Sequence, residues 1–245
     1  GMGKSVARAL GEAGDDVVLA GINVYDKYKT IEDLEAVSDH IRAAGRKALV
    51  VSVDVRESQQ VADMVEKAMS SFGRIDILVN AAGGAFAAPT LDVSDNGWDA
   101  VLRENLKSAF ICCKAVGKVM VSQKRGSIIN FASMAGRASS AGNAHYGAAK
   151  AGIINLTQSL AEEWGPHNVR VNALAPGTIK SEGWVRVQAQ WRGREEADIA
   201  KGIALGRLGV PDDVAGVAVF LASDASEYIT GQTINVNGGE RGYYS

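Results

Sequence analysis

Short apolar runs alternate with amphipathic helical stretches along most of this chain, and this alternation limits its fold more than any other feature. The short runs are rich in Val, Ile and Leu, as in strands buried on both faces of a sheet. We predict strands over residues 16–20, 48–53, 75–80, 127–131, 169–174 and 233–236. We predict helices over residues 30–44, 57–72, 98–123, 145–165 and 211–223. This order predicts an α/β fold, with a doubly wound parallel sheet and helices on both faces.

Length and composition fit one domain of this kind. The chain has 245 residues, of which 47% are hydrophobic and 22% charged, a balance typical of globular domains. Its 26 basic and 28 acidic residues give a net charge of −2, which supplies no basic field for nucleic acid or an anionic membrane. We therefore predict a single domain over residues 1–245, and we expect no nucleic-acid or membrane partner.

Cysteine and histidine usage bears on the compartment and on metal binding. Cys112 and Cys113 are adjacent, and neighbouring cysteines rarely form a disulfide with each other. A chain without a disulfide framework suits a reducing compartment. The three histidines stand alone in the sequence, without the spacing of a zinc site. The apolar run at 214–222 is far shorter than the roughly 18 residues of a membrane span. We predict a cytoplasmic protein without a metal site.

Residues 177–208 interrupt the alternation, because they connect a predicted strand to a predicted helix without a strand pattern of their own. The segment carries Trp184 and Trp191. Its charged residues include Arg186, Arg192, Arg194, Glu195 and Glu196. Connections of this length are uncommon in compact domains and are often functional. We predict a substrate lid, with a helical insertion packed on the surface as the alternative.

Tyr146 and Lys150 lie four residues apart in a predicted helix, so their side chains share one face. A neighbouring ammonium favours the phenolate and lowers the pKa of a tyrosine from about 10, which suits a general acid or base. The spacing alone is not diagnostic, since Tyr25 and Lys29 repeat it. Only Tyr146 is preceded, 13 positions earlier, by a serine just after a strand, Ser133. We interpret Tyr25 and Lys29 as part of a solvated loop.

Polar or small residues follow four of the predicted strands. Asp54 follows the second strand, residues 80–84 the third, Ser133 the fourth and residues 176–181 the fifth. The carboxyl ends of parallel strands share one edge of a sheet, where open α/β folds bind ligands. These turns together predict a site for a flat ligand at that edge.

Taken in order, these motifs resemble those of the short-chain dehydrogenase/reductase family. The resemblance covers residues 1–239 and rests on several motifs. They are Ser133 with Tyr146-x-x-x-Lys150, Asn80-Ala-Ala-Gly83, Pro176-Gly177, Gly206-Arg-Leu-Gly-Val-Pro211 and the ending 229–239. It implies a Rossmann-type fold and an NAD(P)-dependent oxidoreductase. Such an enzyme would transfer a hydride between nicotinamide and a small-molecule substrate, a secondary alcohol or ketone.

The chain opens on Gly1-Met2-Gly3, which is typical of a glycine turn that leads into a helix. In a dinucleotide-binding fold a strand precedes this turn, together with a further glycine. We therefore expect a first strand and a first glycine upstream of Gly1. By resemblance that strand is central in the sheet order 3-2-1-4-5-6-7. Its absence would leave two strands unpaired across a slot of about 9–10 Å.

The resemblance implies roles for four catalytic residues. Tyr146 would exchange a proton with the substrate oxygen, and Lys150 would assist it and hold the nicotinamide ribose. Ser133 would hydrogen-bond the reacting oxygen and stabilise developing charge. Asn105 would complete a proton relay through water. The alternative for Asn105 is a helix asparagine bonded to neighbouring backbone.

The same resemblance implies a set of cofactor contacts. Asp54 would meet the adenine, while the backbone of Ile179 and the hydroxyl of Ser181 would hold the carboxamide. The full set is Gly1, Met2, Gly3, Asp54, Val55, Asn80, Ala81, Gly83, Tyr146, Lys150, Pro176, Gly177, Ile179 and Ser181.

The chain departs from the family pattern at Ala81, where the family has a second asparagine, and at Ser181, where threonine is usual. After the first predicted strand, an acidic residue would bind the ribose hydroxyls and select NAD. Gly21 stands there instead, with Lys27 and Lys29 nearby. We therefore predict NADP as the cofactor, with NAD as the alternative.

Two alternative functions are consistent with the same sequence. Residues 175–183 are similar to those of enoyl- or dienoyl-CoA reductases of the same fold. A non-catalytic nucleotide-binding protein, or an inactive truncated fragment, is the other alternative.

The resemblance also implies an assembly. The predicted helices at 98–123 and 145–165 commonly form one interface in relatives, and the helix at 211–223 forms another with the last strand. A homotetramer is expected, with a dimer as the alternative.

Overall fold

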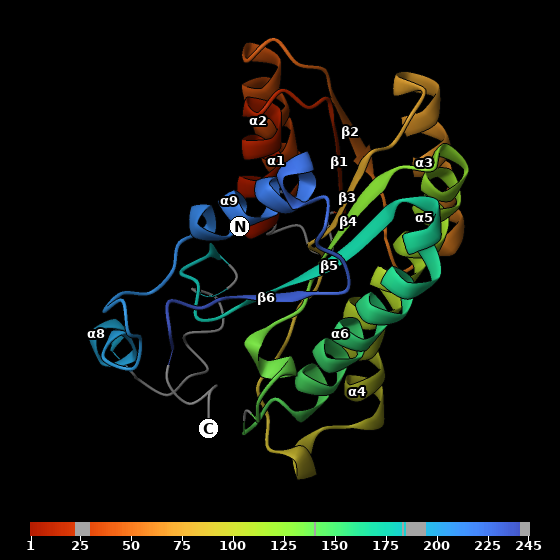
Figure 1. Cartoon of the computed structure of the whole chain (residues 1–245). Coiled ribbons are helices and arrows are strands. Elements are labelled where there is room, and N and C mark those ends of the chain that lie inside the picture. Colours follow the sequence, from red (N-terminus) through yellow and green to blue (C-terminus); the bar gives the residue numbers. More distant parts are fainter. Residues whose placement is uncertain (23–29, 140, 183, 185–194, 241–245) are drawn as a thin grey trace.

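Parallel strands form the middle layer of the molecule, and helices cover both faces (Figure 1). The computed structural model describes residues 1–22, 30–139, 141–182, 184 and 195–240. The strands are β1 Val17–Gly21, β2 Ala48–Ser52, β3 Ile77–Asn80, β4 Gly126–Phe131, β5 Val169–Pro176 and β6 Thr233–Val236. The α-helices are α1 Met2–Glu12, α2 Thr30–Ala43, α3 Ser58–Phe72, α4 Asp95–Leu102, α5 Ser108–Gln123, α6 Ala144–Trp164, α8 Glu196–Ala200 and α9 Pro211–Ala222. The strands pair in parallel, which confirms the predicted doubly wound fold.

Adjacent residues of one strand serve opposite faces of the sheet. Ile128 of β4 packs with Met120 of α5 on one face. Its neighbour Ile129 packs with Leu10 of α1 and Leu221 of α9 on the other. All six residues of β4 are buried. Since successive side chains of a strand point to opposite faces, the apolar runs of the sequence correspond to strands covered on both sides.

The strands β1 and β3 do not pair with each other, so the strands form two parallel sheets. β1 pairs with β2 in a two-stranded sheet, and β3-β4-β5-β6 form a separate four-stranded sheet. Among the described residues, no strand pairs with the free edge of either β1 or β3. Ala20 of β1 is exposed and all four residues of β3 are only half-buried. The break between β1 and β3 therefore lies where we expected an unpaired slot.

Helices join the two sheets across this break. On one face, Gly11 lets α1 approach α2, because a Cβ there would lie 2.7 Å from a side-chain carbon of Ile41. On the other face, Val18 of β1 and Leu78 of β3 pack against one apolar cluster that includes Met64 of α3. Tertiary packing, rather than strand pairing, therefore sets the relative position of the two sheets.

The predicted helix over residues 98–123 differs from the structure. It begins earlier, at α4, where the Ser94 side chain accepts a hydrogen bond from the Gly97 N–H at 3.1 Å. A π-helical turn, Arg103–Lys107, then separates α4 from α5. Such wide turns are frequent at functional sites, and this one carries Asn105.

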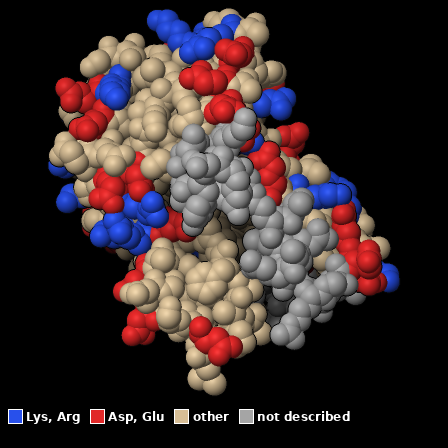
Figure 2. Space-filling view, turned by 180° about the vertical axis from the view of Figure 1, so that it is seen from behind, with Lys and Arg blue, Asp and Glu red and all other residues tan. Residues whose placement is uncertain are grey.

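Acidic and basic side chains are mixed over the face shown in Figure 2, and they do not gather into one basic field. No helix in the described ranges has the length and apolarity needed to cross a membrane. In the same ranges, no three histidine, cysteine or acidic side chains cluster as a metal site would require.

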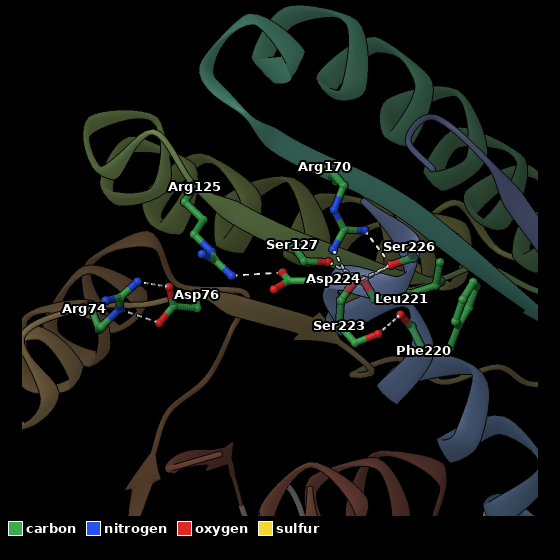
Figure 3. Close-up of polar contacts among 10 residues, drawn as sticks. All are labelled: Arg74, Asp76, Arg125, Ser127, Arg170, Phe220, Leu221, Ser223, Asp224 and Ser226. Carbon is green, nitrogen blue, oxygen red and sulfur yellow. Dashed lines mark hydrogen bonds and ion pairs between the residues drawn. The ribbon is translucent and has the colours of Figure 1, made fainter. Parts of the chain in front are cut away.

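Polar side chains close the C-terminal end of α9, near the start of β4 (Figure 3). The Leu221 carbonyl oxygen accepts hydrogen bonds from Ser127 Oγ at 2.8 Å and from Ser226 Oγ at 3.1 Å. Arg170 donates to the Ser223 carbonyl oxygen at 3.3 Å. The last carbonyls of a helix lack partners within it, so this cluster stabilises the helix end.

Candidate active site

Lys150 and Tyr146 meet at the carboxyl end of β4. Lys150 is buried, with 4% of its surface exposed, and its Nζ donates to the carbonyl oxygen of Phe131 at 2.7 Å. The same Nζ lies 5.5 Å from the ring centre of Tyr146, which is half-buried. Burial lowers the pKa of Lys150 from 10.5 to about 8, against the opposing effect of the Glu104 carboxylate. The predicted helical spacing therefore brings this pair to a strand end.

Ser133 lies two residues beyond β4 and caps the short 3₁₀ turn Met134–Gly136. Its Oγ accepts the N–H of Ala135 at 3.2 Å. A Cβ at Gly136 would lie 2.6 Å from the carbonyl carbon of Lys150. The turn that Ser133 caps therefore packs directly on the part of α6 that carries Lys150.

Asn105 is 1% exposed and faces both its own helix and the turn after β3. Its Nδ2 donates to the carbonyl oxygens of Val101 at 2.9 Å and Gly84 at 2.8 Å. Its Oδ1 is buried without a hydrogen-bond partner in the described part of the chain. A Cβ at Gly83 would lie 2.4 Å from this oxygen and 3.5 Å from the Nζ of Lys150. Buried polar atoms normally have a partner, so this acceptor indicates a place for water or ligand.

The turns after β3 and β5 and the first turn of α2 lie close to the start of α1. A Cβ at Gly3 would lie 3.2 Å from the Cβ of Ala81, which places the turn after β3 against α1. Lys4 pairs with Glu182, beyond β5, at 2.8 Å and with Asp33 of α2 at 3.0 Å. The predicted residues Gly1, Met2 and Gly3 therefore lie near the turn that holds Ser181. The N-terminal end of a helix favours an anion such as a phosphate.

Asp54 is buried beyond β2, and Arg56 binds its carboxylate. Arg56 Nε donates to Oδ1 at 2.8 Å and Nη2 to Oδ2 at 2.7 Å. This guanidinium keeps the pKa of the Asp54 carboxyl below its usual value. Val55, between them, is half-buried. Asn80 points toward β4 and α5 instead, donating to Asn130 Oδ1 at 2.9 Å.

The turn after β5 is held by backbone contacts. Pro176 ends β5, and the Gly177 N–H donates to the Val236 carbonyl oxygen at 3.1 Å. Ile179 is 4% exposed and forms a parallel bridge with Gly209. The Ser181 hydroxyl oxygen accepts the N–H of Trp184 at 3.2 Å.

Some predicted residues lie outside the described parts. They are Tyr25, Lys27, Lys29, Arg186, Trp191, Arg192 and Arg194. Within residues 177–208, the described part includes the helix α8, in a segment for which we predicted no strand and gave a helical insertion as the alternative to a lid.

Three partners of this region were missed by the sequence analysis: Arg56, His145 and Glu240. His145 is fully buried beside Tyr146, with its Nε2 3.0 Å from the Phe86 carbonyl oxygen and its ring stacked on the Phe86 ring at 4.3 Å. The closeness of Arg56 to Asp54 and of His145 to Tyr146 in sequence is the only signal that could have pointed to them.

The residues at this edge fit a nicotinamide dinucleotide. Small residues at Gly3, Ala81 and Gly83 let backbone come close to a flat ligand, and the Asn105 oxygen and the Lys150 ammonium supply an acceptor and a cation. The α1 terminus suits its phosphates.

The chain is similar to known proteins over nearly its whole length. The family model described as enoyl-(acyl carrier protein) reductase matches residues 1–240. The 2-dehydro-3-deoxy-D-gluconate 5-dehydrogenase of Escherichia coli (strain K12) is 38% identical over 240 residues, covering 98% of this chain and 90% of that protein. A Bacillus subtilis (strain 168) protein named "Probable 2,4-dienoyl-CoA reductase" is 36% identical over 242 residues, covering 98% of this chain and 92% of that protein.

A solved structure shows the same fold. The short-chain type dehydrogenase/reductase from Mycobacterium marinum superposes with a TM-score of 0.88 at 34% identity, covering 99% of this chain and 92% of that one. The chain belongs to the short-chain dehydrogenase/reductase family and is an NAD(P)-dependent oxidoreductase.

Proposed function

We propose that this protein interconverts a secondary alcohol and its ketone, with Tyr146 as the general acid or base. The observation that carries the proposal is the convergence of Tyr146, Lys150 and the unpartnered Asn105 oxygen at the carboxyl end of β4, with Ser133 just beyond it. The bound nicotinamide nucleotide supplies or accepts the hydride.

The four side chains have separate tasks in proton transfer. The Tyr146 hydroxyl gives a proton to the forming alkoxide in reduction and takes it back in oxidation. Ser133 accepts a backbone N–H through Oγ, so its own hydrogen is available to the substrate oxygen. The Lys150 ammonium favours the phenolate form of Tyr146. The buried Asn105 Oδ1 accepts from a water that returns protons from solvent.

For the cofactor, we propose that Gly1, Met2 and Gly3 hold the phosphates and that Asp54 and Val55 face the adenine. The nicotinamide side comprises Asn80, Ala81, Gly83, Pro176, Gly177, Ile179 and Ser181, with Tyr146 and Lys150 at the ribose. NADP is the preferred nucleotide, because Gly21 at the end of β1 offers no carboxylate to repel a 2′-phosphate. NAD is the alternative.

We further propose that residues 177–208 form a lid over the substrate. Near its start, Ile179 bridges Gly209, which directly follows the segment, and near its end Ile203 bridges Glu240 after β6. Anchored ends with a long connection between them suit a segment that covers a site.

Reduction of an enoyl- or dienoyl-CoA thioester is the second candidate. Two observations favour it: the description of the matching family model and the similarity to the Bacillus subtilis protein. It would use the same hydride donor, but on a carbon–carbon double bond.

We also propose self-association into a homotetramer, with a dimer as the alternative. A groove of about 500 Å³ runs over α4, α5 and α6, lined by Leu102, Leu106, Phe110 and Leu156 together with charged residues. Phe110 is 46% exposed, and exposed apolar patches commonly mark protein interfaces. A monomeric mass in light scattering would reject this proposal.

The function is tested by following NADPH absorbance with a panel of simple ketones and of enoyl- and dienoyl-CoA thioesters. Turnover of ketones that is lost in Tyr146→Phe supports the first candidate. Turnover of thioesters alone supports the second. Unchanged ketone reduction by Tyr146→Phe would rule out the assigned acid or base.

A further inference from the structure

Glu240 lies directly after the paired glycines of the chain's last motif, and its carboxylate is bound to the turn after β5. The side chain is half-buried. Its Oε2 accepts the backbone N–H of Thr178 at 2.9 Å, and its Oε1 accepts the hydroxyl of the same residue at 2.7 Å. No cation pairs with this carboxylate within the described ranges. Thr178 therefore binds both oxygens of this carboxylate, one through its backbone and one through its side chain.

Gly177 makes this contact possible. A Cβ at Gly177 would lie 2.5 Å from Oε2 of Glu240 and 2.6 Å from the Cβ of Asn237. Both distances are below ordinary contact, so any larger residue would push residues 237–240 away from the turn. The glycine allows the C-terminal segment to lie directly on the backbone that we propose to hold the nicotinamide.

The same segment also holds the far end of the proposed lid. Glu240 forms an antiparallel bridge with Ile203. The N–H of Leu205 donates to the Gly238 carbonyl oxygen at 3.1 Å, and that of Ala204 to the Gly239 carbonyl oxygen at 3.3 Å. Residues 238–240 therefore contact both the start and the return of the segment 177–208.

We propose that Glu240 is a positioning residue that fixes the turn from Pro176 to Ile179 and thereby sets the affinity for the nicotinamide nucleotide. The inference rests on the proposed function, in which this turn holds the nicotinamide carboxamide. Hydrogen bonds to a carboxylate are among the stronger ones in proteins. Without these hydrogen bonds the Thr178 N–H loses its partner and the turn becomes more mobile. Nucleotide binding must then order the turn, and this loss of conformational entropy weakens the affinity.

The test compares Kd values for NADPH and NADH, from nucleotide fluorescence, across variants of the whole chain. Glu240→Ala should raise Kd about tenfold or more. Glu240→Gln should stay within about threefold of the wild type, since an amide can accept the Thr178 N–H and donate to its hydroxyl. Glu240→Ala combined with Thr178→Val should bind no more weakly than Glu240→Ala alone, because the hydroxyl has already lost its partner.

Controls separate a positioning role from a purely structural one. Glu163→Ala, at an exposed position near the end of α6, should leave Kd unchanged. A loss of stability to urea in Glu240→Ala with an unchanged Kd overturns the inference and leaves the proposed function intact. If the wild type binds neither nucleotide, both the inference and the proposed function fail.

Discussion

Replacing Lys150 with methionine should stabilise the nucleotide-free protein at pH 7 while abolishing its activity. Burial lowers the pKa of Lys150 from 10.5 to about 8. At about 1.4 kcal/mol for each tenfold change in the protonation equilibrium, the charged group costs about 3 kcal/mol in the folded state. Methionine removes this cost, but it leaves the Phe131 carbonyl oxygen without its hydrogen bond, at about 1–2 kcal/mol. The expected net gain is about 1–2 kcal/mol.

The pH dependence sharpens this prediction. Between the folded pKa of about 8 and the unfolded pKa of 10.5, the unfolded chain binds a proton that the folded protein has released. Wild-type stability therefore rises with pH across this window, and the cost of Lys150 is fully present only below about pH 8. The advantage of Lys150→Met should shrink as pH rises and reverse near about pH 10.

The assay is urea unfolding of both proteins at pH 7 and pH 10 without nucleotide. Comparing the two proteins at each pH cancels the other titrating groups, which they share. A Lys150→Met protein that is less stable than the wild type by the same amount at both values would refute the reasoning, because the burial of charge would then have no measurable cost.

Three further predictions concern packing and reactivity. Gly117→Ala should lower the free energy of unfolding in urea by about 1–3 kcal/mol, because its Cβ would lie 2.5 Å from the Trp164 ring. Gly216→Ala in α9, where a Cβ would meet nothing within 4 Å, should raise it by about 0.5–1 kcal/mol, and equal effects of the two substitutions would contradict this packing. Burial raises the pKa of both cysteine thiols to about 12, so a thiol reagent at pH 8 should label them only after unfolding, and rapid labelling of the native protein would show the thiols to be accessible. Gly83→Ala should lower turnover about 100-fold in steady-state kinetics by displacing Asn105, and wild-type kinetics would exclude a tight contact there.

The strands were predictable from sequence because they are buried on both faces, as the fully buried β4 illustrates. A short, continuous apolar run is typical of a strand that is covered on both faces of a parallel sheet. The π-turn at Arg103–Lys107 could not be foreseen, since the helical apolar pattern continues on both sides of it.

The candidate site was predictable to the extent that it is local in sequence. The Tyr146–Lys150 spacing and the residues at strand ends follow from short motifs. The Glu240 contact with Thr178 spans 62 positions and the His145 contact with Phe86 spans 59. Such contacts depend on how distant elements pack, which no local pattern contains.

Titration of NADPH and NADH into the chain, followed by nicotinamide fluorescence, tests the central claim most directly. The geometry around Gly3, Ala81, Gly83 and Lys150 predicts saturable binding of both nucleotides. NADPH should bind the tighter, because Gly21 at the end of β1 offers no carboxylate to repel a 2′-phosphate. Absence of saturable binding by either nucleotide would contradict the proposal that these residues form a nicotinamide site.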